Sequence, residues 1–234
     1  MPGDVTPLAI GIFGKIPVRG DFVRAGLPRD FVDTWDSWLT TVMSATRQHA
    51  GEAWLPAFLE APIWRFSLPA GLCGAGAVIG VMIPSVDRAG RYFPLTVAAV
   101  GPVSGFIVDA AAGVWLDRCE TAGLAALERD AEPDAILAIL GVPALSTRQS
   151  PTVRELIDSP PSWPGLSGPP VLAPAAPDDL DQRSKWWSDG APRVPAGTMT
   201  LTGLPEAAVY AEMLGLSSAK QHLVQAGQPK DMLE

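Results

Sequence analysis

The chain has 234 residues, of which 47% are hydrophobic, and its formal net charge at pH 7 is −8, with a pI near 4.8. This hydrophobic share is enough to build a core and excludes a disordered chain. The acidic balance argues against a nucleic-acid surface, which needs clustered Lys and Arg to neutralise phosphates. No apolar run approaches the roughly 20 residues that a membrane span requires, so we expect no transmembrane segment.

The cysteines and the first residues bear on the cellular compartment. Cys73 and Cys119 are too few for a disulfide framework or a zinc site. The opening residues, MPGDVTPLAIG, lack the charged and apolar regions of a signal peptide. The sequence therefore predicts a cytoplasmic protein.

Strand and helix patterns alternate in the first part of the chain. They predict a strand at residues 8–16, a helix at 28–50, a second helix at 54–59 and a half-buried strand at 64–68. In the long helix, Trp35, Trp38 and Val42 recur at helical spacing. An aromatic face of this kind usually packs into a core, so we expect this helix to cover one face of a sheet.

The densest strand signal lies in the middle of the chain. Residues 77–83 form a run without charge, which is typical of a strand covered on both faces. Turn-forming residues follow at 84–90, and residues 91–100 return to a strand pattern, so the two runs predict a hairpin with a long loop. Because Pro94 has no N–H for a strand ladder, we expect the second strand to lie at an edge or to be bulged near this residue.

The remainder divides into helical, Pro-rich and closing parts. Apolar spacing predicts a long helix from Phe106 to Leu127 and another at 136–140, ended by Gly141. Residues 143–197 hold 11 of the 24 prolines and three tryptophans, so we interpret them as an irregular strap that packs partly on the domain surface. The whole chain is interpreted as one domain, with the main sheet and helices at 1–142, the strap at 143–197, a closing strand and helix at 198–216 and a polar tail at 217–234.

No catalytic constellation in the sequence favours an enzyme class. The two histidines, His49 and His222, fit no triad or metal-ligand pattern, and no cofactor motif is complete. Asp21 and Asp87 could be paired carboxylates, but both have an arginine close in sequence, and structural ion pairing is the commoner outcome.

Four motifs together resemble one known family. They are Gly14-Lys15-x-Pro17-x-x-Gly20-Asp21-Phe22, Ala61-Pro62-Ile63-Trp64-Arg65-Phe66, Pro84-Ser85-Val86-Asp87-Arg88-x-Gly90-Arg91-x-Phe93-Pro94-Leu95 and Ser184-x-Trp186-Trp187. In this order they are similar to the TagF (ImpM) family of bacterial type VI secretion. The resemblance covers nearly the whole chain and implies an α/β (α+β) fold, a mostly antiparallel sheet with helices on both faces in a longin-like or profilin-like three-layer arrangement.

The resemblance also implies a function. It suggests a cytoplasmic, non-catalytic protein that represses type VI secretion after translation by binding the forkhead-associated scaffold protein of the system, with no cofactor or metal. Self-association is left open. The alternatives are an enzyme or a small-GTPase-binding longin-like module that uses Asp21, Asp87 and Arg91.

The motifs also supply a candidate partner-binding surface. We expect the loop around Lys15 and the loop around Asp87 to form one mixed-charge patch beside the paired tryptophans. Its residues are Lys15, Arg19, Asp21, Ser85, Asp87, Arg88, Arg91, Trp186, Trp187 and Asp189. Asp87 has two open interpretations: it is either an exposed acid that complements the arginines of a forkhead-associated domain, or a turn cap paired with Arg91.

Overall fold

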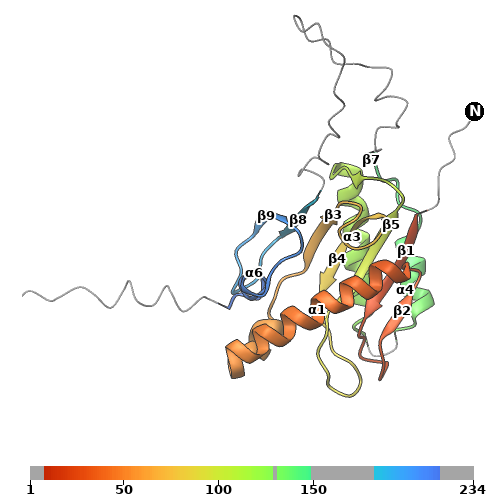
Figure 1. The fold of residues 1–234 in the computed structure, drawn as a ribbon. Coiled ribbons are helices and arrows are strands. Elements are labelled where there is room, and N and C mark those ends of the chain that lie inside the picture. The colour runs from red at the N-terminus through yellow and green to blue at the C-terminus, as the bar shows by residue number, and fades with distance from the viewer. Residues whose placement is uncertain (1–7, 129–130, 149–181, 217–234) are drawn as a thin grey trace, which may run out of the picture.

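The computed structural model describes residues 8–128, 131–148 and 182–216 (Figure 1). Within these residues the elements follow in the order β1 (Ala9–Gly14), β2 (Val23–Ala25), α1 (Arg29–Ala50), η1 (Gly51–Ala53), α2 (Trp54–Leu59), β3 (Trp64–Leu68), β4 (Ala77–Ile83), β5 (Leu95–Gly101), β6 (Gly105–Phe106), α3 (Ala110–Ala125), α4 (Pro133–Leu140), β7 (Thr147–Arg148), β8 (Arg183–Ser188), β9 (Gly197–Thr202) and α6 (Ala207–Met213). In this part of the chain, no helix has the length and apolar character needed to cross a membrane.

The described strands build one large antiparallel sheet and a small ribbon. The large sheet has seven strands in the order β2-β1-β5-β4-β3-β8-β9, and β6 pairs with β7 beside it. β4 pairs with β5 along its whole length, from Ala77 opposite Gly101 to Ile83 opposite Leu95. All seven residues of β4 are buried, which confirms the interior strand that the uncharged run predicted.

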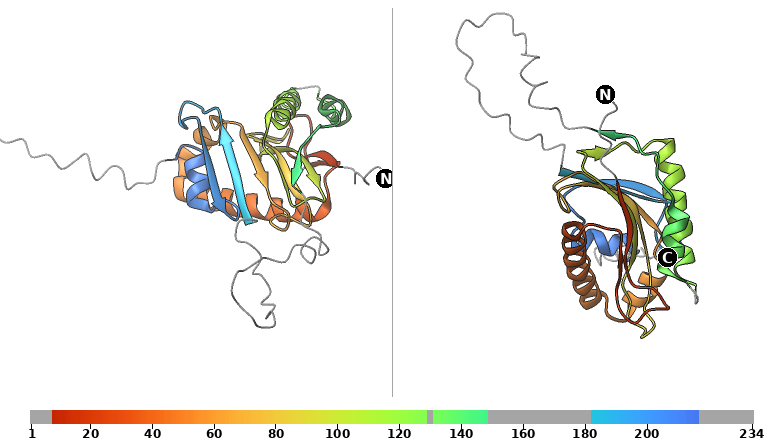
Figure 2. Two further views of the ribbon diagram at one scale, coloured as in Figure 1. Left: turned by 90° about the horizontal axis from the view of Figure 1, so that it is seen from above. Right: turned by 90° about the vertical axis from the view of Figure 1, so that its right-hand side faces the viewer.

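Helices cover both faces of the sheet, so the fold has three layers (Figure 2). α1 and α6 pack together on one face, while α3 lies on β4 and β5 at the other face and contacts α4. This confirms the predicted mixed α/β class, with a mostly antiparallel sheet between helices.

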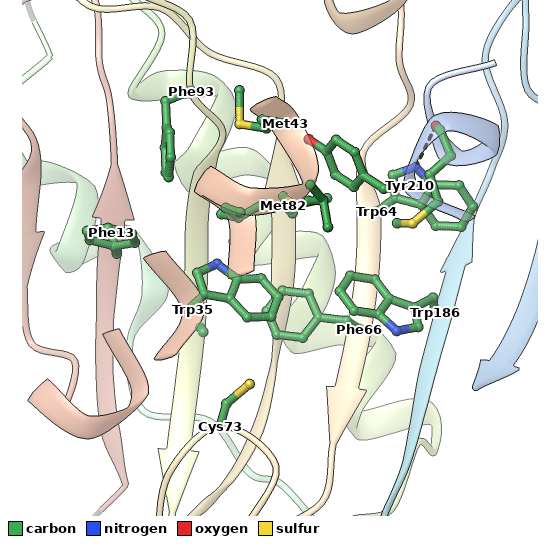
Figure 3. Close-up of a cluster of buried hydrophobic side chains, with 14 of the residues drawn as sticks. Phe13, Trp35, Met43, Trp64, Phe66, Cys73, Met82, Phe93, Trp186 and Tyr210 are labelled. Atoms are coloured by element: carbon green, nitrogen blue, oxygen red, sulfur yellow. Dashed lines mark hydrogen bonds between the residues drawn. The ribbon is translucent and has the colours of Figure 1, made fainter. Parts of the chain in front are cut away.

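The two faces of the sheet hold different cores. The core under α1 is rich in aromatic side chains, whereas the core under α3 and α4 is built mainly from aliphatic residues. In the aromatic core, Trp35 stacks on Trp186 with ring centroids 6.0 Å apart, and Phe66 lies against both (Figure 3). Trp35 Nε1 also donates a hydrogen bond of 2.9 Å to Thr96 Oγ1, so its polar atom is satisfied within the core. The predicted core face of α1 is thereby confirmed.

The expectation for Pro94 was wrong. β5 lies between β1 and β4, so it is an interior strand and not an edge strand. The pair Val86–Tyr92 continues the register of Ile83 and Leu95 across the proline, so no bulge interrupts it. Pro94 is tolerated because it precedes the first residue of the regular ladder, where a backbone donor is not needed.

Two further boundaries differ from the sequence pattern. The helix expected from Phe106 begins at Ala110, because Asp109 caps it by accepting a hydrogen bond of 2.9 Å from the Ala112 N–H. Residues 183–188, expected in an irregular strap, form the regular strand β8. The part of the Pro-rich stretch at 149–181 and the tail at 217–234 lie outside the described residues.

Candidate functional site

Two loops that the sequence singled out meet at one end of the sheet. One loop follows β1 and the other joins β4 to β5, and because β1 and β5 are neighbours, both loops emerge at the same end (Figure 1). The Arg88 N–H donates a hydrogen bond of 2.9 Å to the Arg19 carbonyl, and the Arg91 side chain donates to the Gly20 carbonyl. Gly14 has a φ of 139°, and a Cβ there would lie 2.1 Å from the Pro94 carbonyl oxygen. This close approach explains why a glycine begins the first loop.

Asp87 is the acceptor on which both loops converge. Its Oδ2 accepts hydrogen bonds of 2.9 Å from Lys15 Nζ and 2.7 Å from Arg91 Nε. Its Oδ1 accepts from the backbone N–H groups of Ala89, at 2.9 Å, and Arg91, at 2.8 Å. The second interpretation of Asp87, a turn cap paired with Arg91, therefore describes its contacts.

The cluster around Asp87 is buried. The Asp87 side chain has no exposed surface, and that of Lys15 is 7% exposed. Burial by itself would raise the pKa of the Asp87 carboxyl, but the hydrogen bonds from the Arg91 backbone, Lys15 and the Arg91 side chain outweigh it and hold the pKa far below its usual range. Ser85 is also buried, and its Oγ donates a hydrogen bond of 2.6 Å to the Lys15 carbonyl. We call Lys15, Ser85 and Asp87 the Asp87 cluster.

Exposed side chains surround this cluster. Arg91 links the buried cluster to the exposed side chains: it pairs with Asp87, but its side chain is 58% exposed and lies 4.0 Å from an Asp21 carboxylate oxygen. The Arg19 side chain is 52% exposed and forms an ion pair of 3.2 Å with Glu132, just before α4. We call Arg19, Asp21, Phe22, Arg88 and Arg91 the exposed rim, because all five residues are exposed.

Phe22 belongs to this surface although the candidate list omitted it. It is 46% exposed, stacks on Phe13 with centroids 5.6 Å apart and meets Phe93 edge-on at 4.8 Å. The Lys15 ammonium group lies 5.1 Å from the centre of its ring. An aromatic residue within a loop of glycine and charged residues was the available signal, and the first motif contained it.

The paired tryptophans do not belong to this patch, which corrects the expectation. Neighbouring residues in a strand point to opposite faces. Trp186 is fully buried in the aromatic core, whereas Trp187 is half-buried against the aliphatic core on the other face. Neither offers an exposed ring beside the Asp87 cluster.

Asp189 also lies with a different charge group. Its carboxylate is 3.8 Å from the Arg65 guanidinium, which pairs at 2.9 Å with Asp117 and at 2.5 Å with Glu120, both on α3. Arg65 therefore ties β3 to α3. The ten candidate residues thus divide into seven that the structure brings together and three that it places in or beside β8.

The exposure and charge of the patch also correct the proposed role of Asp87. With no exposed surface and four hydrogen bonds, this carboxylate cannot meet a partner's arginines directly. The six charged candidates in the two loops are Lys15, Arg19, Arg88 and Arg91 against Asp21 and Asp87, which sum to +2, and Glu132, which pairs with Arg19, lowers the local charge to +1. The patch is therefore positive on a chain whose net charge is −8.

The chemistry of the Asp87 cluster fits a structural role better than proton transfer. A carboxylate with a strongly lowered pKa and fully used acceptors is a poor general base. Asp21 has a fully exposed side chain and lies in no enclosed site. Among residues 8–128, 131–148 and 182–216, no group of three or more His, Cys, Asp or Glu side chains could hold a metal ion.

Comparisons with known proteins agree with the motif order. The family model described as the TagF N-terminal domain, type VI secretion system-associated, matches residues 11–141. Among solved structures, the crystal structure of PA0076 from Pseudomonas aeruginosa PAO1 is similar, with 34% sequence identity and a TM-score of 0.65. The match covers 88% of this chain and 93% of that chain. No curated protein sequence matches the chain significantly.

Proposed function

Because the chain belongs to the TagF family, which is associated with type VI secretion, we propose that it represses this secretion after translation. It acts as a cytoplasmic, non-catalytic binding protein, and its partner is the forkhead-associated scaffold protein of the system. The exposed rim is the contact surface. The observation that carries this site is a group of exposed charged side chains and an exposed Phe22, held by a buried cluster beneath them.

The rim has the composition of a protein-binding surface. Arginine and aromatic side chains contribute a large share of binding energy at interfaces, because they bury wide areas and make directed hydrogen bonds. The Arg91 side chain donates a hydrogen bond to the Gly20 carbonyl, two residues before Phe22, and the Arg88 N–H donates one to the Arg19 carbonyl. These bonds join the loop of the two arginines to the loop of Phe22. A preorganised loop loses less conformational entropy on binding, which favours affinity.

The charge of the rim indicates the kind of surface that it meets. Its local positive charge complements an acidic region of the scaffold. An arginine-lined phosphothreonine site, in contrast, would repel it. We therefore propose that the rim contacts the scaffold away from such a site.

The catalytic alternative has less support. Asp87, its principal candidate acid, has all its contacts inside the protein. A binding protein titrates its target, so repression should scale with the ratio of this protein to the scaffold, whereas a catalyst acts by turnover at low abundance. Measuring secretion while the expression ratio is varied in cells separates the two.

The contact surface is tested with charge reversals on purified proteins. Arg88→Glu should weaken the affinity for the scaffold about tenfold, mainly through slower association, and should reduce its salt dependence. The matched control is Arg29→Glu on α1, whose side chain is 88% exposed and which lies outside both loops. Calorimetry and association kinetics measure both variants. If the wild-type protein had no affinity for the scaffold, the proposed partner would be wrong. If wild type and Arg88→Glu bound the scaffold equally well, the exposed rim would not be the contact surface.

A further inference from the structure

A second polar surface lies at the opposite end of the sheet from the Asp87 cluster. The β4–β5 loop connects Ile83 to Leu95, whereas the other end of this strand pair, at Ala77 and Gly101, leads toward the ribbon of β6 and β7 (Figure 1). A cavity of about 410 Å³ lies there, between this ribbon and the sheet. This volume is in the range of small-molecule sites.

The floor of the cavity is an open face of β3, β8 and β9. Ser67 on β3 pairs with Lys185 on β8, and Lys185 pairs with Thr200 on β9. Residues that pair across antiparallel strands point to the same face, so these three side chains form one row. Phe66 and Trp186, the neighbours of this row, point into the aromatic core on the other face. α3 packs on β4 and β5, and the row lies beyond them in the sheet order.

The ribbon of β6 and β7 forms the wall. Ser104 fixes it by donating from Oγ to the Arg148 carbonyl at 2.9 Å, while the Ser104 carbonyl accepts from the Ala70 N–H at 3.1 Å. These bonds place Arg148 at the cavity, together with Arg183 and Lys185 from β8. Three cationic side chains from two separate parts of the chain therefore line one hollow.

These cationic groups have no counter-ion within the described part of the chain. Among residues 8–128, 131–148 and 182–216, no ion pair joins Arg148, Arg183 or Lys185 to an acid, whereas Arg19, Arg65 and Arg91 each pair with one. Ser67 is only 8% exposed and lines the cavity. Its hydroxyl has no hydrogen-bond partner among the same residues. Thr200 adds a second hydroxyl to the same row.

We propose that this cavity binds the phosphate group of a phosphate monoester. Such a group carries a charge near −2 at neutral pH and has three acceptor oxygens. Two guanidinium groups, one ammonium group and two hydroxyls supply matching donors, and guanidinium groups pair well with phosphate. A single carboxylate would leave most of this positive charge uncompensated. The cavity is larger than a phosphate group, so it has room for the group that the phosphate esterifies.

The experiment is a titration of the isotope-labelled full-length protein, followed by two-dimensional NMR at constant ionic strength. Three probes are used: phosphothreonine, adenosine monophosphate and inorganic phosphate. We expect saturable shifts of the backbone amides of Gly105, Phe106 and Thr200. The relative affinities of the probes show whether an amino-acid ester, a nucleotide or the phosphate group alone is recognised. Shifts that rise without saturation for all three probes would overturn the proposal.

Variants locate the binding. Lys185→Met should weaken the affinity about tenfold, because a charge-assisted hydrogen bond is lost. Thr200→Val keeps the shape of the side chain, removes only the hydroxyl and should weaken binding severalfold. Arg29→Met is the matched control on the other face of the sheet and should bind like the wild type. The same spectra report whether each variant is folded. An equal loss of affinity in Arg29→Met and Lys185→Met, or no loss in both Lys185→Met and Thr200→Val, would overturn the site.

Discussion

The two ends of the sheet use charge in different ways. At the end with the β4–β5 loop, Lys15 and Arg91 meet one buried carboxylate, Asp87, whose acceptors are fully used within the chain. At the other end, Arg148, Arg183 and Lys185 line an open cavity with hydroxyl groups. A buried ion pair loses hydration that its partners must replace, whereas exposed cations keep their hydration until a ligand arrives. Burial therefore distinguishes charges that support the fold from charges available for binding.

Within the first end, the same difference separates the Asp87 cluster from the exposed rim. Asp87 and Asp21 both lie within reach of Arg91, but their side chains have 0% and 103% of their reference exposure. A candidate list drawn from motifs treats these two acids alike. Their burial predicts that one is needed for stability and that the other is available for a partner.

The largest expected effect is on stability, from removing the buried acid. Asp87→Ala should lower the free energy of unfolding by about 3–5 kcal/mol, because it leaves Lys15 buried without its carboxylate and removes the acceptor of two backbone N–H groups. Chemical denaturation followed by circular dichroism measures this change.

The matched control for this prediction is Asp21→Ala. Its side chain is fully exposed and 4.0 Å from Arg91, so the change should stay within about 0.5 kcal/mol. If both alanine variants changed the denaturation midpoint equally, burial would not distinguish the two acids.

The next prediction concerns acid pH. The pKa of Asp87 is lowered in the folded protein, so its contribution is fully present above the unfolded value of about 3.9 and is lost as the pH falls through the folded pKa. The stability difference between the wild type and Asp87→Asn should therefore be constant near neutral pH and shrink below about pH 4. Denaturation midpoints of both proteins across this range measure it. A difference that grows on acidification would show that the carboxylate is not stabilised in the fold.

Sequence patterns predicted the framework of these two ends well. The uncharged run of β4 and the helical spacing of α1 are strong signals because burial on both faces, or on one helix face, fixes the residue type at each position. The charged residues in two of the motifs also led us to expect the loops of Lys15 and Asp87 side by side, and the ion pair of 2.9 Å confirms this proximity.

The exposure of individual side chains was harder to predict. A loop with Asp87, Arg88 and Arg91 has the composition of a solvated turn. The acid is nevertheless buried, and one of its partners, Lys15, lies 72 residues away in the sequence. β8 was missed because the prolines around it dominate the composition, although its tryptophans alternate faces as strand residues do.

The cavity at the far end had no local signal in the sequence. Its polar side chains include Ser67, Arg148, Arg183, Lys185 and Thr200. Apart from Arg183 and Lys185, which share β8, these residues come from separate parts of the chain. None of them belongs to a charge run or a phosphate-binding loop of known spacing. Strand register alone brings Ser67, Lys185 and Thr200 into one row.

The smallest expected change in the free energy of unfolding is at this far end, and its direction is stabilising. Lys185→Met removes one of three like charges around the cavity, and its side chain is exposed, so the unfolding free energy should stay unchanged or rise by at most about 0.5 kcal/mol in a phosphate-free buffer. Salt at about 1 M should remove even this gain by screening the repulsion. Because a ligand stabilises only the state that binds it, added phosphothreonine should raise the thermal midpoint of the wild type more than that of Lys185→Met. A loss of stability in the ligand-free variant comparable to that of Asp87→Ala would mean that Lys185 supports the fold as the buried charges do, and the contrast between the two ends would fail.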